Sequence, residues 1–152
     1  MRTGEGVDER GAAGEAGDEA APSHGVRKGR AGMSPSVAFT VPGPVPSKSN
    51  FRRGGKGWRD RWARIVAYEQ EVGLSAICAG ARQHMGSGPA RVKVLLVNQR
   101  LDLDNALKCP IDGLKSLAFV DDSPEHLQAI QVCQATDDGP VRAEFRVEWE
   151  GE

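Results

Sequence analysis

The first 32 residues contain no Leu, Ile, Phe, Tyr or Trp, and this feature most restricts what the 152-residue chain can fold into. The stretch holds eight Gly and six Ala among six acidic and five basic residues. Such a composition buries too little apolar surface to offset the conformational entropy that ordering the chain would cost. We therefore expect a disordered tail over 1–32 and one domain over 33–152.

Several classes of protein are excluded by what the chain lacks. It has no run of about 18 apolar residues, so no membrane-spanning helix is expected. The acidic, Gly-rich start has no apolar segment of the kind found in a secretory signal. Cys78, Cys109 and Cys133 form no C-x-x-C pair, which argues against a disulfide framework and a cysteine zinc site. Together these features predict a cytoplasmic protein.

The net charge of −1 hides two oppositely charged halves. Residues 33–100 carry 11 Lys and Arg against three acids, whereas residues 101–152 carry four Lys and Arg against 12 acids. One interpretation is a polyanion-facing basic surface beside a metal-binding carboxylate cluster. The other is that the two halves neutralise each other when the chain folds, and charge alone does not decide between them.

Hydrophobic periodicity predicts six elements in the order strand, helix, strand, helix, strand, strand. They are a strand Ser36–Pro42, a helix from about Trp58 with Trp62, Ile65, Val66, Glu69 and Val72 near one stripe, a strand Arg91–Val97, a helix capped by Asp104 or Asn105 and reaching about Leu117, and strands Leu127–Ala135 and Val141–Trp149.

The last two strands flank Asp137-Asp138-Gly139-Pro140, a sequence typical of a turn, and we expect them to form a β-hairpin. Residues 141–149 alternate apolar and charged side chains, so one face of the sheet should be packed and the other wet. The predicted fold class is α+β, with a small mixed sheet and the helices packed on one face.

Acidic residues cluster where a strand is expected to give way to a helix. Asp102 and Asp104 would point to the same side of an extended segment, and Lys108 follows Asp104 by one helical turn. The Asp121–Asp122 turn could bring in a third carboxylate, provided that the tertiary fold cooperates. Three carboxylates without His or Cys are hard oxygen ligands, which suit Mg²⁺, or Mn²⁺ in its place. Such a site would suit phosphodiester hydrolysis, with Lys108 adding positive charge at the transition state.

The same residues also have a purely structural interpretation. Asp104 could be the N-cap of the helix, worth about 1 kcal/mol, or the partner of Lys108 in an exposed ion pair worth about 0.3 kcal/mol. Asp121 and Asp122 could be no more than a solvated turn. The residue pattern alone leaves both interpretations open.

The spacing of these residues resembles the RusA family of Holliday junction resolvases. The matching positions are Asp102-Leu103-Asp104-Asn105-x-x-Lys108, then Asp112-Gly113-Leu114, then Ala118-Phe119-Val120-Asp121-Asp122. The Pro-rich segment 41–50 is similar to the family's opening segment. The resemblance extends over about 37–149, but only 102–122 is specific.

The resemblance implies a Mg²⁺-dependent, homodimeric endonuclease that cuts four-way DNA junctions in recombination and repair. By position, Asp102, Asp104 and Asp122 match the family's metal-binding acids, and Lys108 matches its essential lysine. Asp121 matches a common acid whose role stays open. Two features depart from the family: Pro110 lies inside the predicted helix, and the segment after Asp122 is longer.

Junction DNA would require a basic surface near the acids, because each phosphate contact releases counterions. The candidates lie in the Pro/Gly-rich loop and at the start of the following helix; they are Lys48, Phe51, Arg52, Arg53, Lys56, Arg59, Arg61 and Arg64. Phe51 would stack on, or wedge at, an unpaired base near the crossover. The alternative is an ordinary solvated helix face.

We therefore expect a Mg²⁺-dependent endonuclease that acts on branched DNA. Two alternatives stay open: a DNA-binding module that keeps the fold but has lost catalysis, and a nuclease that prefers flaps or forks.

Overall fold

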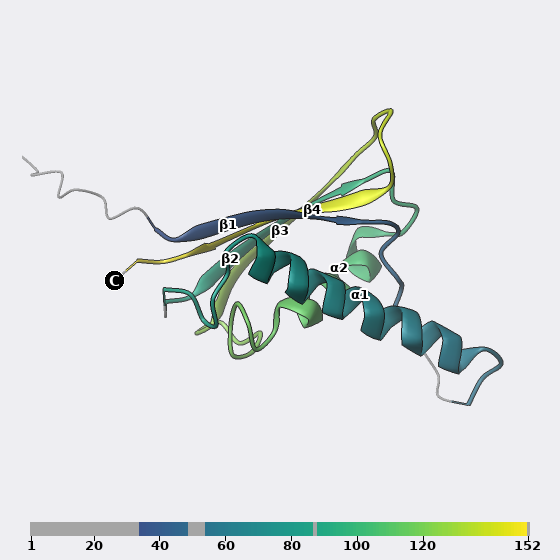
Figure 1. Cartoon of the computed structure of the whole chain (residues 1–152), viewed down its shortest axis with the longest axis horizontal. Helices are drawn as coiled ribbons and strands as arrows, with labels where there is room; N and C mark the ends of the chain where they lie inside the picture. The colour runs from purple at the N-terminus through teal and green to yellow at the C-terminus, as the bar shows by residue number, and fades with distance from the viewer. Residues whose placement is uncertain (1–33, 49–53, 87, 152) are drawn as a thin grey trace, which may run out of the picture. The chain divides into compact units, whose positions relative to one another are not determined.

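Four strands form one mixed sheet, and two helices lie on one of its faces (Figure 1). The computed structural model describes residues 34–48, 54–86 and 88–151, so the predicted tail 1–32 lies outside the described residues. The α+β class and the placement of both helices on one face are confirmed. The elements are β1 (Ser36–Pro42), α1 (Trp58–Cys78), β2 (Ala90–Val97), α2 (Leu103–Leu114), β3 (Leu127–Ala135) and β4 (Arg142–Trp149).

The predicted β-hairpin is wrong, because β3 and β4 are not neighbours in the sheet. The strand order is β1-β4-β2-β3, in which β2 pairs in parallel with β3 and antiparallel with β4. Along β3 only Leu127 is buried, whereas β4 buries Ala143, Phe145, Val147 and Trp149. The more apolar strand therefore occupies the interior of the sheet, and the polar strand takes an edge.

The connection between β3 and β4 crosses the end of β2 and is fixed there. The side-chain nitrogen of Asn98, the residue after β2, donates to the backbone oxygens of Asp137 and Gly139 at 3.1 and 2.9 Å. Arg142 Nε and Nη2 donate to Glu144 and Asp137 at 2.9 and 2.5 Å. Asp137-Asp138-Gly139-Pro140 thus connects two strands that lie on either side of β2, instead of closing a hairpin between adjacent strands.

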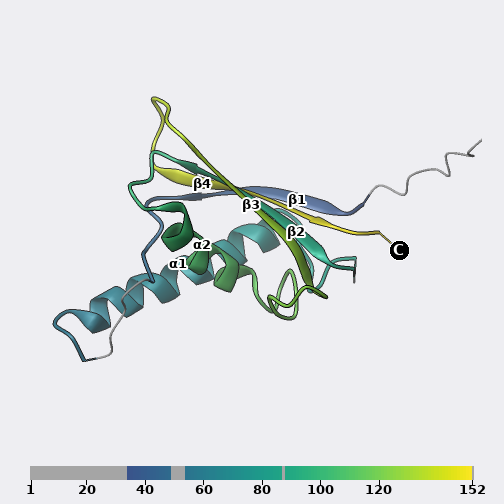
Figure 2. The same cartoon turned by 180° about the vertical axis from the view of Figure 1, so that it is seen from behind.

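One face of the sheet forms the core, and Figure 2 shows from behind that both helices lie on this side. The face carries Val41, Val92, Val94 and Leu96 beside the apolar residues of β4. Phe39 and Phe145 are register partners whose rings stack, with centroids 4.8 Å apart and planes 4° from parallel. The alternation predicted for residues 141–149 is thus confirmed.

The helices differ from the predictions at their ends and on one face. In α1 the stripe is displaced, because Ile65, Tyr68, Val72 and Ala76 are buried while Trp62 is 42% exposed. The N-cap of α2 is Asp102 rather than Asp104 or Asn105, and the helix ends at Leu114, three residues earlier than expected; Pro110 is inside it and buried. The backbone of Asp102 is extended, with φ −63° and ψ 147°, and helical geometry starts at the next residue, Leu103. The helix therefore begins before the predicted cap positions.

The two helices cross closely at Gly113 of α2. A Cβ atom at this position would meet Val72 Cβ at 2.8 Å and Glu69 O at 2.9 Å. Only a glycine allows this approach, which brings Glu69 of α1 next to the charged residues of α2.

Candidate active site on α2 and the acidic turn

The first acids of the predicted site lie at the amino end of α2. Asp102 is the N-cap residue but makes no side-chain cap hydrogen bond, and Asp104 lies in the first helical turn. Both side chains are exposed. Within the part of the chain that the structure describes, Asp104 and Lys108 form no ion pair. Neither structural interpretation of Asp104, as the cap or as the partner of Lys108, is therefore what the fold uses.

The tertiary structure brings Lys108 and Asp122 together, although they are 14 residues apart in the sequence. Both line one cavity of about 230 Å³ at the side of α2. Lys48 from the Pro-rich segment and Asp112 from α2 complete its charged lining, and Leu107 and Ile111 supply the apolar part. The acidic turn therefore returns to α2, as a shared site requires.

The remaining acids do not join this cavity. Asp102 and Asp104 are absent from its lining. Over residues 34–48, 54–86 and 88–151, no group of three or more His, Cys, Asp or Glu side chains is arranged to hold a metal ion. Asp102, Asp104 and Asp122 therefore suit Mg²⁺ in their donor chemistry, but the fold does not gather them into a preformed site.

A chain of ion pairs connects Asp122 to the Pro-rich segment. Lys115 Nζ lies 3.4 Å from Asp122 Oδ2 and 3.1 Å from Asp112 Oδ1. The other oxygen of Asp112 accepts a hydrogen bond of 2.5 Å from Lys48 Nζ, and Lys48 also pairs with Glu69 of α1. We call Lys48, Glu69 and Asp112 the Lys48 clasp. It joins the segment after β1 to both helices.

Burial and pairing act in opposite directions on the pKa values of the clasp. Burial alone would lower the pKa of Lys48, but its hydrogen bonds to Asp112 and Glu69 outweigh this effect and raise the pKa. Burial would likewise raise the pKa of Asp112, yet hydrogen bonds from Lys48 and Lys115 hold it below the ordinary value. The hydrogen bond to Asp112 also raises the pKa of Lys115. Lys48, Asp112 and Lys115 are therefore charged at neutral pH.

The adjacent thiol of Cys109 is a neutral part of this region. It is fully buried and lies 3.9 Å from Glu69 Oε1. Burial, together with the nearby charge of Glu69, raises its pKa to about 12. Cys109 therefore acts as a small packed side chain rather than as a nucleophile.

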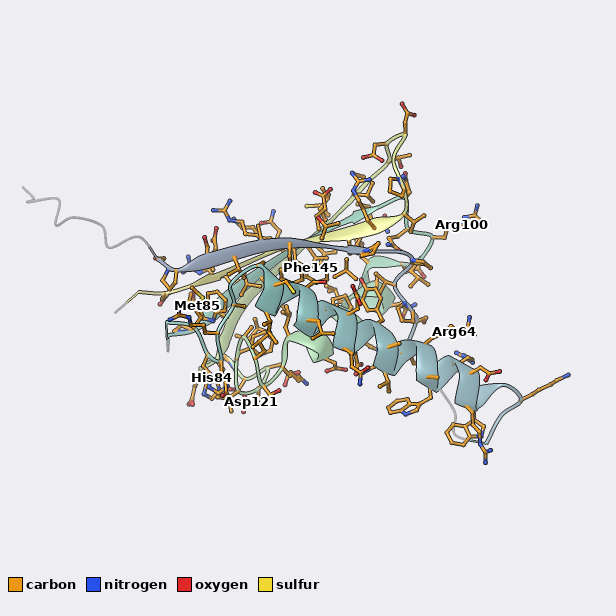
Figure 3. All side chains as sticks on the ribbon, in the orientation of Figure 1. Arg64, His84, Met85, Arg100, Asp121 and Phe145 are labelled. Carbon is orange, nitrogen blue, oxygen red and sulfur yellow. The ribbon has the colours of Figure 1, made fainter. Side chains whose placement is uncertain are left out.

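The two aspartates of the acidic turn have different surroundings. Asp121 Oδ1 accepts hydrogen bonds of 2.9 Å from the Ser123 backbone and from His126 Nδ1, whereas Asp122 faces Lys115. Hydrogen bonds from Ser123 and His126 lower the pKa of Asp121 to about 2. Ser123 Oγ also contacts Nδ1 of His126, so both contacts use the same ring nitrogen and cannot form a Ser–His–Asp relay. Asp121, labelled in Figure 3, has 54% of its side chain exposed.

The predicted basic surface is described only in part. Phe51, Arg52 and Arg53 lie outside the described residues. Lys48 is in the clasp, with 19% of its side chain exposed.

The described basic residues beyond Lys48 lie at or just before the start of α1. They are Lys56, Arg59, Arg61 and Arg64, and all are exposed. Arg59 lies over the Trp58 ring at 5.7 Å from its centroid. In Figure 1 this end of α1 projects beyond α2 and the sheet, which makes it accessible to a large polyanion.

Three residues of the ion-pair chain were missed as site residues by sequence reasoning. Asp112 was noted only as part of a motif, although Asp112 and Lys115 follow Lys108 at helical spacing and share its face. Glu69 gave no such signal, because its contact with Lys48 depends on how the Pro-rich segment packs against α1.

Comparison with models of known protein families gave no match, and a search of curated proteins gave none either. No helix in the described ranges is long and apolar enough to cross a membrane.

Proposed function

We propose that the chain is a Mg²⁺-dependent, structure-specific endonuclease that cleaves branched DNA, with four-way junctions as its substrate. The observation that carries the proposal is that Lys108 and Asp122 line one cavity. The acidic turn therefore returns to the side of α2 that carries Lys108, although Asp102 and Asp104 lie outside this cavity. The likeness to the RusA family adds support through residues 102–122 alone.

The proposed roles follow from the chemistry of the side chains. By their donor chemistry Asp102, Asp104 and Asp122 would hold Mg²⁺, which would polarise a phosphoryl oxygen and lower the pKa of an attacking water. This would require the amino end of α2 and the acidic turn to approach each other, because the described fold does not gather these acids. The ammonium of Lys108 stabilises the negative charge that builds up on the reacting phosphate. The exposed Lys56, with the arginines of α1, binds the flanking phosphates.

A homodimer in the cytoplasm is part of the proposal. A four-way junction has approximate twofold symmetry, so a C2 dimer would present one acid cluster to each of two opposed strands. The support for a dimer is this match of symmetry together with the family likeness.

The test is a cleavage assay on four-way, forked, flapped and linear DNA of matched sequence, with and without Mg²⁺. We expect Mg²⁺-dependent nicking of the four-way junction and little cleavage of the linear duplex. Preferential cutting of flaps or forks would instead support the alternative that the chain is a nuclease specific for those structures.

Asp104→Asn separates catalysis from binding, because it removes the negative charge of a proposed metal ligand without changing the shape of the side chain. We expect it to abolish cleavage and leave junction binding largely intact. Asp138→Asn, an exposed aspartate in the loop before β4, is the matched control and should cut like the wild type. Cleavage by Asp104→Asn at the wild-type rate would disprove the assignment.

A second candidate is a branched-DNA-binding module without catalytic activity. It is favoured by the finding that the described acids are not gathered into a group able to hold a metal. Binding to the four-way junction, with no Mg²⁺-dependent nicking of any of the substrates, would support this non-catalytic module over the endonuclease.

A further inference from the structure

A groove of about 720 Å³ runs between the Pro-rich segment and α1. Pro44, Val45 and Pro46 form one wall, and Ile65 and Tyr68 of α1 lie on the other. Its volume lies within the range of roughly 300–1,000 Å³ that is usual for small-molecule sites. The groove is distinct from the cavity that contains Lys108.

The Pro-rich wall is held rigidly. Pro42, Pro44 and Pro46 each have a fixed φ, and Gly43 between the first two takes the left-handed φ of 90° that turns the chain after β1. Gln99, just after β2, accepts a hydrogen bond of 2.9 Å from the Val45 backbone and donates one of 3.1 Å to the Gly43 oxygen. The groove is therefore formed before any ligand arrives, which reduces the entropy cost of binding.

The charge on the groove favours an anion at one edge. Arg61 and Arg64 of α1 belong to its lining, and among the described lining residues Glu71 is the one acid. Figure 3 shows Arg64 pointing outward from α1, so its guanidinium is accessible from solvent. An apolar slot with arginines at its edge suits a ligand that has a flat apolar body and a phosphate.

The groove and the Lys108 cavity share one segment of chain. Val45 and Pro46 line the groove, and Lys48, two residues further on, lines the cavity. The groove and the cavity are therefore neighbours along this segment of the chain.

We propose that this groove binds one unpaired nucleotide of the branched DNA. The base lies against Pro44, Val45 and the edge of Tyr68, and its phosphate lies at Arg64 and Arg61. This inference rests on the proposed function, since it places the branch point of the branched DNA substrate at this groove. Paired bases cannot enter, because a base must leave its stack to fill a pocket of this size. The groove therefore distinguishes a branch point from a continuous duplex.

The test uses a four-way junction with 2-aminopurine at the branch point, without divalent metal so that no cleavage can occur. We expect the fluorescence to rise when wild-type protein binds, because the base leaves the stack. Ala67→Phe fills the groove from an exposed position of α1 and should abolish this rise. It should also weaken junction binding roughly tenfold, because the contacts of one bound base are lost. Binding to linear duplex should be unchanged.

Ala63→Phe is the matched control, because Ala63 is exposed one turn earlier on α1 and is not part of the groove lining. This variant should behave like the wild type. Arg64→Gln should reduce the slope of log affinity against log salt by about one, as expected for one lost phosphate contact. Thermal melting of all three variants checks that they fold.

The possible outcomes separate the two proposals. A full fluorescence rise with Ala67→Phe, or an equal loss with Ala63→Phe, would overturn the groove assignment while leaving the endonuclease proposal intact. A rise that Ala67→Phe abolishes, in a protein that cuts no substrate when Mg²⁺ is added, would support the groove and overturn the endonuclease. Equal affinity for branched and linear DNA would overturn the groove assignment, while the cleavage assay decides the endonuclease proposal separately.

Discussion

Replacing Lys48 with Met should destabilise the fold by about 2 kcal/mol. Breaking a fully buried ion pair costs roughly 3–5 kcal/mol, and an exposed pair contributes less than about 1 kcal/mol. The clasp lies between these limits, since 19% of the Lys48 side chain and 34% of the Asp112 side chain remain exposed. Methionine fills nearly the same space, so the lost energy comes from leaving Glu69 and Asp112 without the ammonium.

The pH dependence of this effect follows from the direction of the pKa shifts. The pKa of Asp112 lies below its ordinary value of 3.8 in the folded state, so its contribution is present above that value and is lost as the pH falls through the folded pKa. The pKa of Lys48 is raised above 10.5, so its contribution is lost only above that pH. The difference between wild type and Lys48→Met should therefore be constant from about pH 5 to 9 and shrink below about pH 4.

Urea denaturation at pH 7 and pH 3 measures this difference, with an expected fall in the midpoint of roughly 1 M at pH 7. Lys56→Met is the control, because Lys56 is exposed and its loss should change the midpoint very little. Equal midpoints for Lys48→Met and wild type at pH 7, or a difference as large at pH 3 as at pH 7, would refute the clasp as a source of stability.

Three further predictions concern the core, the Pro-rich wall and the tail. Gly113→Ala should lower the free energy of unfolding by about 1–3 kcal/mol through overpacking, whereas Gly73→Ala, whose new Cβ would lie 3.5 Å from Gly113 O, should be neutral or stabilising; thermal melting compares them. Gln99→Ala should cost about 1–3 kcal/mol in the same measurement, because the buried Val45 would lose its backbone hydrogen bond. Removing 1–32 should leave the melting temperature and cleavage rate nearly unchanged, and a large fall in either would show that this stretch contributes to the domain.

Local patterns were enough to predict where most elements lie. The strand Ser36–Pro42 and the strand Leu127–Ala135 have the predicted bounds, and the helix from Trp58 begins where expected. Side-chain alternation and helical spacing are properties of short stretches, so the sequence reveals them directly. The N-cap of α2 differed from the prediction by two or three residues, because Asp102, Asp104 and Asn105 are all acceptable caps by residue type.

The candidate site was predictable as a set of residues but not as an arrangement. The pattern from Asp102 to Asp122 identified the acids and Lys108. It did not indicate that Asp121 would hydrogen-bond within its own turn while Asp122 faces Lys115. Neighbouring residues with the same side chain cannot be distinguished by residue type, because their different partners are set by the conformation of the turn.

The sequence by itself determined the α+β class, the position of the elements, the alternation of β4 and the charged residues around α2. Only the tertiary structure decided that β2 lies between β3 and β4, that Lys48 joins both helices through Glu69 and Asp112, and that Lys108 and Asp122 share a cavity. The physical reason is the range of the interactions. Periodicity reflects neighbours within a few residues, whereas strand order, helix crossing and ion pairing depend on which distant surfaces can be buried together.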